Sequence, residues 1–187
     1  ENNYKAIMTS PNCLTGTDRV AEVSKKINSR IYVNVQGDEP LINFKDVKKI
    51  ISAKKKFKNH VVCGFSKLNL DEDVNNKNIP KVVLNKKNEL LYISRSAIPS
   101  SKDKSKEKIK YLKQVCIYAF SKKELSIFQK IKKKNRLEKY EDIEILRFLE
   151  LGKKVKMVRL NTKTYAVDVL SDIKKVEKIL KKNVKKT

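Results

Sequence analysis

The segment from residue 31 to residue 40 reads IYVNVQGDEP and marks the end of a predicted β-strand. Its first half, residues 31–35, is apolar except for Asn34, and Gly37 follows soon after, as expected of a short buried strand. Asp38 comes just past this strand, and in open α/β sheets ligands bind beyond the carboxyl ends of the strands. Judged by position alone, Asp38 is equally well explained as a turn residue.

Strands and helices alternate on both sides of this segment, and the helical stretches carry apolar residues at helical spacing. The alternation predicts an α/β fold with a mostly parallel sheet and crossover helices. We expect strands at 4–8, 31–35 and 61–67, a helix at 17–27 with Thr17 as its N-cap, and a helix at 44–57.

The rest of the chain adds a hairpin extension to this sheet. Two β-type runs joined by a polar turn, at 81–84 and 90–94, are typical of a hairpin. The chain has no internal repeat and no linker, so we assign residues 1–187 to a single domain. We further expect a strand at 115–120, a helix begun by a capping box of Ser121 and Glu124, a helix at 137–151 ended by Gly152, a strand at 155–160, an extended piece at 165–169 and a helix at 171–180.

The formal net charge of +24 over 187 residues raises the question of a polyanionic partner. The lysines are spread along the chain, and no zinc-finger, basic-zipper or RNA-recognition pattern accompanies them. We therefore interpret them as solvated lysine faces and expect no specific nucleic-acid partner. A positive field would still steer an anionic ligand toward the protein.

Cysteine spacing and hydropathy indicate the compartment. Cys13, Cys63 and Cys116 lie far apart with no C-x-x-C pair, which argues against a disulfide framework or a zinc site and fits a reducing cytoplasm. No apolar run reaches the ~18–20 residues that span a bilayer. No signal peptide is recognisable either, so we expect a cytoplasmic protein without membrane insertion.

Two further features bear on chemistry. Asp168 follows a short apolar stretch and precedes a predicted helix, so it could converge with Asp38 at one sheet edge. Two carboxylates together with nucleotide phosphate oxygens would suit Mg²⁺. Residues 15–19, TGTDR, begin a predicted helix, where backbone amides and the Arg19 guanidinium could meet a ligand. Each feature also has a plain structural explanation, as a helix cap or an ordinary helix start.

A family resemblance favours the functional interpretation. Residues 15–23, TGTDRVAEV, followed by 33–40, VNVQGDEP, resemble 3-deoxy-manno-octulosonate (Kdo) cytidylyltransferase, the CMP-Kdo synthetase. The similarity covers nearly the whole chain in order. It continues through 81–84 (KVVL), 91–99 (LYISRSAIP), Ile117-Tyr118, Leu137-Glu138, Glu144, Leu146-Arg147 and Val167-Asp168.

The resemblance implies a Rossmann-like nucleotide-diphospho-sugar transferase sandwich, usually a homodimer, that joins CTP and Kdo into CMP-Kdo and pyrophosphate for lipopolysaccharide biosynthesis. It implies Asp38 and Asp168 as catalytic ligands of magnesium. It implies a nucleotide site at Thr15, Gly16, Arg19 and Gln36, and a sugar site at Arg95, Gln114, Tyr118 and Glu138.

The chain departs from the family pattern in two places. The family's first strand and its triphosphate-cradling loop are missing, so we expect an N-terminally truncated fragment that is unstable and inactive alone. Gln114 stands where the family commonly has His, and Cys116 where it has Gly, which suggests an altered sugar such as 8-amino-Kdo. The alternatives are a CMP-acylneuraminate synthetase, an inactive truncated remnant, and a non-catalytic cationic binding protein.

Overall fold

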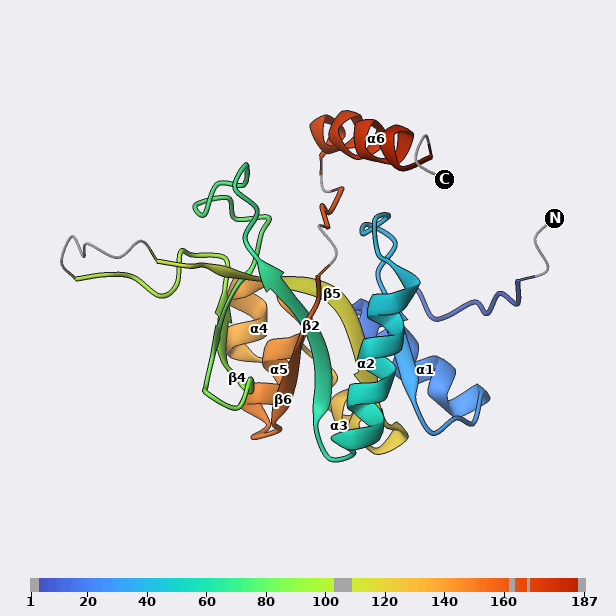
Figure 1. Ribbon diagram of the computed structural model, residues 1–187. Helices are drawn as coiled ribbons and strands as arrows, with labels where there is room; N and C mark the ends of the chain where they lie inside the picture. The colour runs from blue at the N-terminus through green and yellow to red at the C-terminus, as the bar shows by residue number, and fades with distance from the viewer. Residues whose placement is uncertain (1–3, 103–108, 162–163, 168, 185–187) are drawn as a thin grey trace.

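A computed structural model describes residues 4–102, 109–161, 164–167 and 169–184. Within these ranges one mixed sheet has the strand order β4-β3-β5-β2-β6, and β1 also pairs with β5 (Figure 1). The strands are β1 Tyr32–Val35, β2 Val61–Lys67, β3 Lys81–Leu84, β4 Leu90–Ser94, β5 Leu112–Phe120 and β6 Val155–Arg159. The helices are α1 Gly16–Lys26, α2 Phe44–Lys56, α3 Lys122–Lys130, α4 Arg136–Glu141, α5 Ile145–Glu150 and α6 Leu170–Val184.

The long strand β5 organises the sheet. One of its edges pairs with β2, while its other edge is shared, with β3 at Lys113 and β1 at residues 117–120. Between these pairings the Gln114 amide donates to the Pro80 carbonyl at 3.0 Å, and the Cys116 carbonyl accepts from the Gln36 amide at 3.3 Å. The end of β1 and the start of β3 therefore diverge at the middle of β5.

The α/β class is confirmed, but the predicted mostly parallel pairing is not observed. Among the described strands only β2 and β6 pair in parallel. The register shows the reason: β1 and β2 both run antiparallel to β5, so they share one direction but are not neighbours. The strand–helix alternation predicted their common direction correctly, and the later strand β5 inserts between them.

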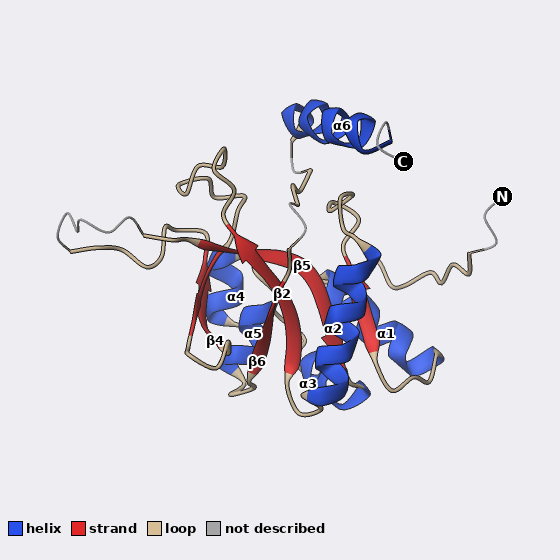
Figure 2. Ribbon diagram, in the orientation of Figure 1, coloured by secondary structure: helices blue, strands red, loops and turns tan. Residues whose placement is uncertain are grey.

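Helices cover both faces of the sheet (Figures 1 and 2). On one face lies α2, whose Ile50 packs in a cluster with Val62 and Val115. On the other face α1, α3 and α5 contribute to the larger core, where Phe148 lies 4.9 Å from Phe128 and 5.6 Å from Phe120 between ring centroids. Burial of both faces makes an α/β sandwich, as the family resemblance implies.

Several predicted boundaries need correction. The helix expected at 137–151 is two helices, because Asp142 adopts a left-handed conformation with φ of 51° between α4 and α5. The N-cap of α1 is Thr15 rather than Thr17, since the Thr15 hydroxyl accepts from the Asp18 amide at 3.2 Å. Residues 4–8 form no strand, and Tyr4 is 89% exposed.

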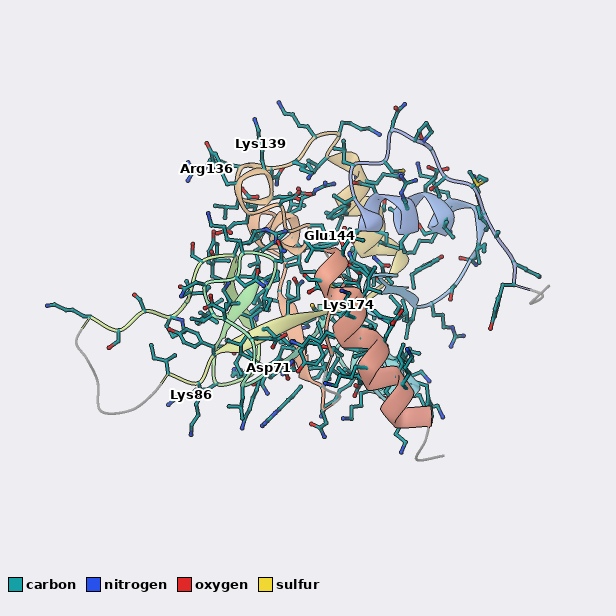
Figure 3. The ribbon with its side chains drawn as sticks, turned by 90° about the horizontal axis from the view of Figure 1, so that it is seen from above. Asp71, Lys86, Arg136, Lys139, Glu144 and Lys174 are labelled. Atoms are coloured by element: carbon teal, nitrogen blue, oxygen red, sulfur yellow. The ribbon has the colours of Figure 1, made fainter. Side chains whose placement is uncertain are left out.

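Other sequence predictions are confirmed. The hairpin of β3 and β4 forms, the capping box of Ser121 and Glu124 is complete, and Gly152 has a φ of 66° just after α5. Basic side chains such as Lys86 and Lys139 point outward (Figure 3). In the described part of the chain no helix is both long and apolar enough to cross a membrane.

Candidate functional site

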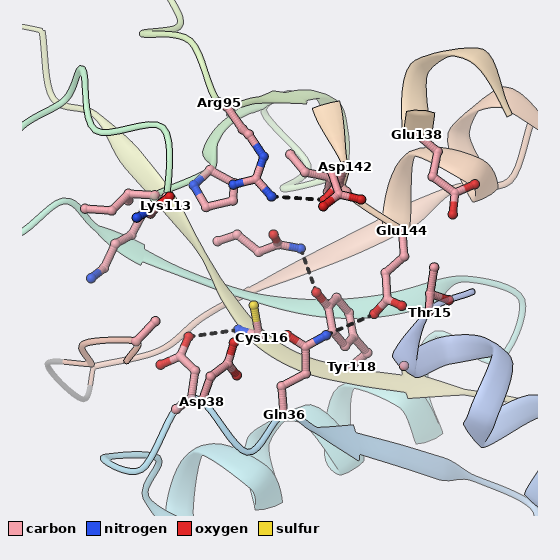
Figure 4. Close-up of a pocket in the computed structure, with 18 of the residues that line it drawn as sticks. Thr15, Gln36, Asp38, Arg95, Lys113, Cys116, Tyr118, Glu138, Asp142 and Glu144 are labelled. Atoms are coloured by element: carbon pink, nitrogen blue, oxygen red, sulfur yellow. Dashed lines mark hydrogen bonds between the residues drawn. The ribbon is translucent and has the colours of Figure 1, made fainter. Parts of the chain in front are cut away.

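A cavity of about 270 Å³ lies where β1 and β3 diverge along β5 (Figure 4). Its walls come from the start of α1, the loop after β1, the middle of β5, the segment before β3 and the junction of α4 and α5. The structure thus gathers most of the predicted site residues in one place. They are Thr15, Gly16, Gln36, Asp38, Arg95, Gln114, Tyr118 and Glu138.

Glu144 ties the start of α1 to the loop after β1. Its carboxylate accepts from the Thr17 amide at 2.8 Å and from the Gln36 side-chain amide at 3.2 Å (Figure 4). Burial raises the pKa of the Glu144 carboxyl. Because it accepts from the Thr17 amide, the carboxylate occupies the position that the N-terminus of α1 offers to an anion. The family resemblance includes Glu144 but implies no role for it, and only the tertiary structure shows its partners.

Gly16 and Gln36 meet on this side of the cavity. A β-carbon added to Gly16 would lie 3.4 Å from the Asn34 side-chain nitrogen and 3.7 Å from that of Gln36. Both distances correspond to ordinary van der Waals contact, so the start of α1 lies close to the end of β1. The wall that the two elements form together is the part of the cavity expected to face a nucleotide.

Two predicted residues are not brought to the cavity by the described structure. Arg19 is exposed, and its guanidinium donates to the Thr9 hydroxyl at 2.7 Å and to the Ser10 carbonyl at 3.2 Å, so it holds the N-terminal segment instead. Asp168 lies outside the described residues. The residue before it, Val167, donates its amide to the Asp38 carbonyl at 2.8 Å.

Carboxylate oxygens without a hydrogen-bond donor mark the loop after β1. Asp38 Oδ1 is buried and has no partner in the described structure, and the same holds for Glu39 Oε2. The other Glu39 oxygen accepts from the Cys116 amide at 3.2 Å, and burial raises the pKa of this carboxyl. Sequence reasoning missed Glu39, because nothing in the pattern separated a buried acid from an exposed turn residue.

Such oxygens are hard ligands of the kind that Mg²⁺ prefers. The described residues contain no cluster of three or more His, Cys, Asp or Glu side chains that could hold a metal. Mg²⁺ commonly takes one or two carboxylates and completes its shell with substrate phosphates and water. The donor set of Asp38 and Glu39 therefore fits a magnesium ion that arrives with a nucleotide.

Gln114 and Tyr118 form the floor of the cavity on the other side. The Gln114 amide nitrogen donates to the Tyr118 hydroxyl at 3.1 Å, and the two residues are 5% and 2% exposed. Burial raises the pKa of Tyr118 well above its ordinary value, so the phenol stays protonated. The hydroxyl accepts from Gln114, so the floor presents an uncharged pair of polar side chains to a ligand.

The three cations that line the cavity differ in their partners. Lys113 pairs with Glu72 at 2.5 Å and Lys134 pairs with Asp142. Arg95 has no ion pair among the described residues. Its guanidinium is held instead by the backbone carbonyls of residues 77, 141 and 142, at 2.7, 2.5 and 3.0 Å. Arg95 is therefore a rigid cation whose charge is free to attract an anionic ligand.

Glu138 belongs to the wall, but its carboxylate is engaged. The side chain is fully buried, and each of its oxygens accepts from the Arg147 guanidinium at 2.6 Å. Arg147 also donates to Asp18 at 3.1 Å, so the ion pairs link α1, α4 and α5 behind the cavity. The geometry gives Glu138 a supporting position rather than a free group facing a sugar.

The family model described as Cytidylyltransferase matches residues 1–155. The chain belongs to the cytidylyltransferase family. This cytidylyltransferase is 33% identical over 186 residues to the 3-deoxy-manno-octulosonate cytidylyltransferase of Flavobacterium johnsoniae, with 96% of this chain and 74% of that one covered. It is 37% identical over 187 residues to the protein of the same name from Chloroherpeton thalassium, with 97% and 74% covered.

Solved structures agree with the family assignment. A CMP:2-keto-3-deoxy-manno-octonic acid synthetase complexed with CTP superposes on the cytidylyltransferase with a TM-score of 0.86 and 31% identity, covering 97% of this chain and 74% of that one. A putative glucose-1-phosphate thymidylyltransferase from Bacillus anthracis has a TM-score of 0.58 at 12% identity, covering 87% of this chain and 59% of that one. The second likeness is one of fold alone.

Proposed function

We propose that this protein activates Kdo with CTP, giving CMP-Kdo and pyrophosphate. The observation that carries the proposal is the cavity beside β5, which is lined by Asp38 with its unpartnered oxygen, by the residues expected at the nucleotide and by Arg95, a cation with no ion pair among the described residues. The 31% identity to a synthetase solved with CTP supports the choice of nucleotide. The names of the relatives support the choice of sugar.

Each wall has a part in the reaction. Thr15, Gly16 and Gln36 hold the cytidine, and Arg95 attracts the carboxylate of the sugar. The anomeric hydroxyl of the sugar attacks the α-phosphorus in line with the departing pyrophosphate. Acceleration comes from positioning two anionic substrates and from neutralising the charge that develops on the phosphoryl oxygens.

Asp38 would hold magnesium, joined by Asp168 and by the free Glu39 oxygen. The hydrogen bond from the Val167 amide to the Asp38 carbonyl supports this pairing, because it brings the residue before Asp168 to the Asp38 backbone. When bound, the metal supplies positive charge at the phosphoryl oxygens. Asp38 itself would hold the ion from a loop that the Glu39–Cys116 hydrogen bond fixes to β5.

Gln114 supports a second candidate substrate. This buried amide lies beside Tyr118 on the cavity floor, where it presents neutral donors and acceptors to the sugar. A modified Kdo such as the 8-amino form is therefore the alternative substrate. Comparing kcat/KM for Kdo and 8-amino-Kdo decides between them, and a clear preference for Kdo would reject the alternative.

We also propose that a further strand completes the sheet at the free edge of β1. Within the described residues β1 pairs only with β5, and Val35 is 44% exposed. Leu14, just before α1, is another apolar side chain that is 48% exposed. A protein that carries such a strand should be more stable and active than residues 1–187 alone. Measuring the unfolding midpoint and the turnover of both lengths tests this.

Localisation and assembly are proposals as well. We propose a homodimer, as the family resemblance implies, and a cytoplasmic location, which the free cysteines favour. Light scattering of the full-length protein measures the assembly.

Pyrophosphate release by the full-length protein with CTP, Mg²⁺ and a panel of acidic sugars tests the function. Turnover with Kdo supports it. Turnover restricted to an acylneuraminate would refute the sugar assignment. Absence of CTP binding together with salt-sensitive binding of nucleic acid would refute the enzyme assignment altogether.

A further inference from the structure

Lys81 is a buried cation that the proposed reaction does not use. It is fully buried at the start of β3 and has no ion pair among the described residues. Its ammonium donates to the carbonyls of Asn76, at 3.0 Å, and of Arg95. Burial is the main cause that lowers the pKa of Lys81, and the Arg95 charge adds to it. An ammonium in such a place costs folding free energy that an apolar side chain would not.

Both carbonyls belong to segments that form walls of the cavity. The Asn76 carbonyl begins the stretch 76–80, whose last residues line the cavity, and Arg95 lines it directly. Lys81 itself is not among the lining residues. Its side chain therefore lies behind the wall and joins two of its parts.

Arg95 extends the same network from its other end. Its guanidinium reaches the carbonyls of Lys77, Glu141 and Asp142. Two cations and five backbone carbonyls thus connect the segment before β3, the turn after β4 and the junction of α4 and α5. Holding Arg95 through both its carbonyl and its guanidinium leaves its charge in one fixed direction.

Acidic groups near this network are already engaged. The Glu141 carboxylate accepts from the Ser94 hydroxyl at 2.6 Å and from the Arg95 amide at 2.9 Å. Asp73, the other carboxylate that acts on Lys81, accepts from the amide of Asn75 at 2.9 Å. The charge of Lys81 is therefore balanced only at a distance, and it adds to the positive potential that Arg95 presents.

We propose that Lys81 is a positioning residue that fixes Arg95 and the 76–80 wall for the acidic sugar, an inference that rests on the proposed function. Loss of its donors would leave two carbonyls unpaired and release the backbone of Arg95. The sugar side of the cavity would lose its geometry, while the CTP side, formed by α1 and the end of β1, would keep its own. The effect is therefore selective between the two substrates.

Lys81→Met in the full-length protein tests the proposal, because methionine has a similar length and no donor. Lys54→Met is the matched control. Lys54 is 2% exposed and also donates to two backbone carbonyls, those of Lys58 and His60, but it pairs with Glu124 and lies outside the cavity lining. The measurements are KM for Kdo, KM for CTP, kcat and the urea midpoint.

We expect Lys81→Met to raise KM for Kdo by about tenfold or more, with KM for CTP changed by less than about twofold. Lys54→Met should lower the urea midpoint and leave both KM values unchanged. Equal KM values for Kdo in the two variants, with turnover by the wild-type protein intact, would overturn the positioning role of Lys81 but not the proposed function. No turnover by the wild-type protein would refute the proposed function, and the inference with it.

A second variant covers the case in which Lys81→Met does not fold. Lys81→Gln keeps two donor hydrogens but removes the charge. It should raise KM for Kdo by a smaller factor and again spare KM for CTP. An unchanged KM for Kdo in this variant would overturn the inference.

Discussion

The Arg147→Met substitution tests how the site is supported from behind. Arg147 is fully buried, binds both oxygens of Glu138 at 2.6 Å, reaches Asp18 at 3.1 Å and lies 3.7 Å from the Phe128 ring centroid. Methionine fills much of the volume but removes every donor. Glu138, itself fully buried, would then keep only the Asn135 amide at 3.2 Å.

The expected cost follows from this geometry. Breaking a buried ion pair by removing one partner costs about 3–5 kcal/mol. Asp18 has access to solvent, with a side chain that is 12% exposed, so most of the loss comes from Glu138. With a urea m-value of about 2 kcal/mol/M, the unfolding midpoint should fall by about 1.5–2.5 M. Such a loss is a large part of the stability of an ordinary domain.

Urea unfolding followed by circular dichroism measures the shift. The double variant Glu138→Gln with Arg147→Met should recover part of the loss, because it no longer leaves a buried carboxylate unpaired. A fall in the free energy of unfolding of less than about 1 kcal/mol for Arg147→Met would refute the reasoning, since it would mean that Glu138 finds water or another donor.

Three further predictions concern the core and the acidic loop. Gly64→Ala should cost about 1–3 kcal/mol in unfolding free energy, since the new β-carbon would lie 2.7 Å from a Leu160 methyl and 3.2 Å from the Val115 carbonyl. Burial raises the pKa of Cys63 to about 12, so iodoacetamide at pH 8 should leave this thiol unmodified until the protein unfolds, which peptide mass mapping can follow. Burial also raises the pKa of Glu39 above its value in the unfolded chain. In the pH interval between these two pKa values, the folded state binds a proton that the unfolded state has lost, so stability falls as pH rises through the interval. Glu39→Gln should therefore stabilise the metal-free protein most at a pH above this interval, and it should give no gain below about pH 4. A gain in the urea midpoint that is equal under these two conditions would contradict the prediction.

The sequence predicted the local elements well, because their signals are local. The β2 bounds and the capping box of Ser121 depend on neighbouring residues only, and both agree with the structure. The break at Asp142 could not be predicted in this way. The Arg95 guanidinium, distant in the chain, donates to the Asp142 carbonyl at that point. Strand pairing was missed for a related reason, since β5 enters between β1 and β2 from far along the chain.

The candidate site shows the same division. Motif positions such as Gln36, Asp38 and Tyr118 converge on the cavity as predicted. Glu39 and Glu144 acquire significance only through burial and through partners that lie far apart in the sequence. Arg19 fits the motif, but its guanidinium donates to Thr9 and Ser10 in the N-terminal segment and does not line the cavity.

Pyrophosphate release by the full-length protein and its Asp38→Asn variant tests the central claim most directly. Asp46→Asn is the matched control, because Asp46 is a buried acid that also has an unpartnered oxygen among the described residues, but it lies on α2 and outside the cavity lining. With CTP, Kdo and Mg²⁺ at saturation, Asp38→Asn should lower kcat by about 100-fold or more, while Asp46→Asn should retain the wild-type rate per folded molecule. Full turnover by Asp38→Asn, or an equal loss in both variants, would contradict the account.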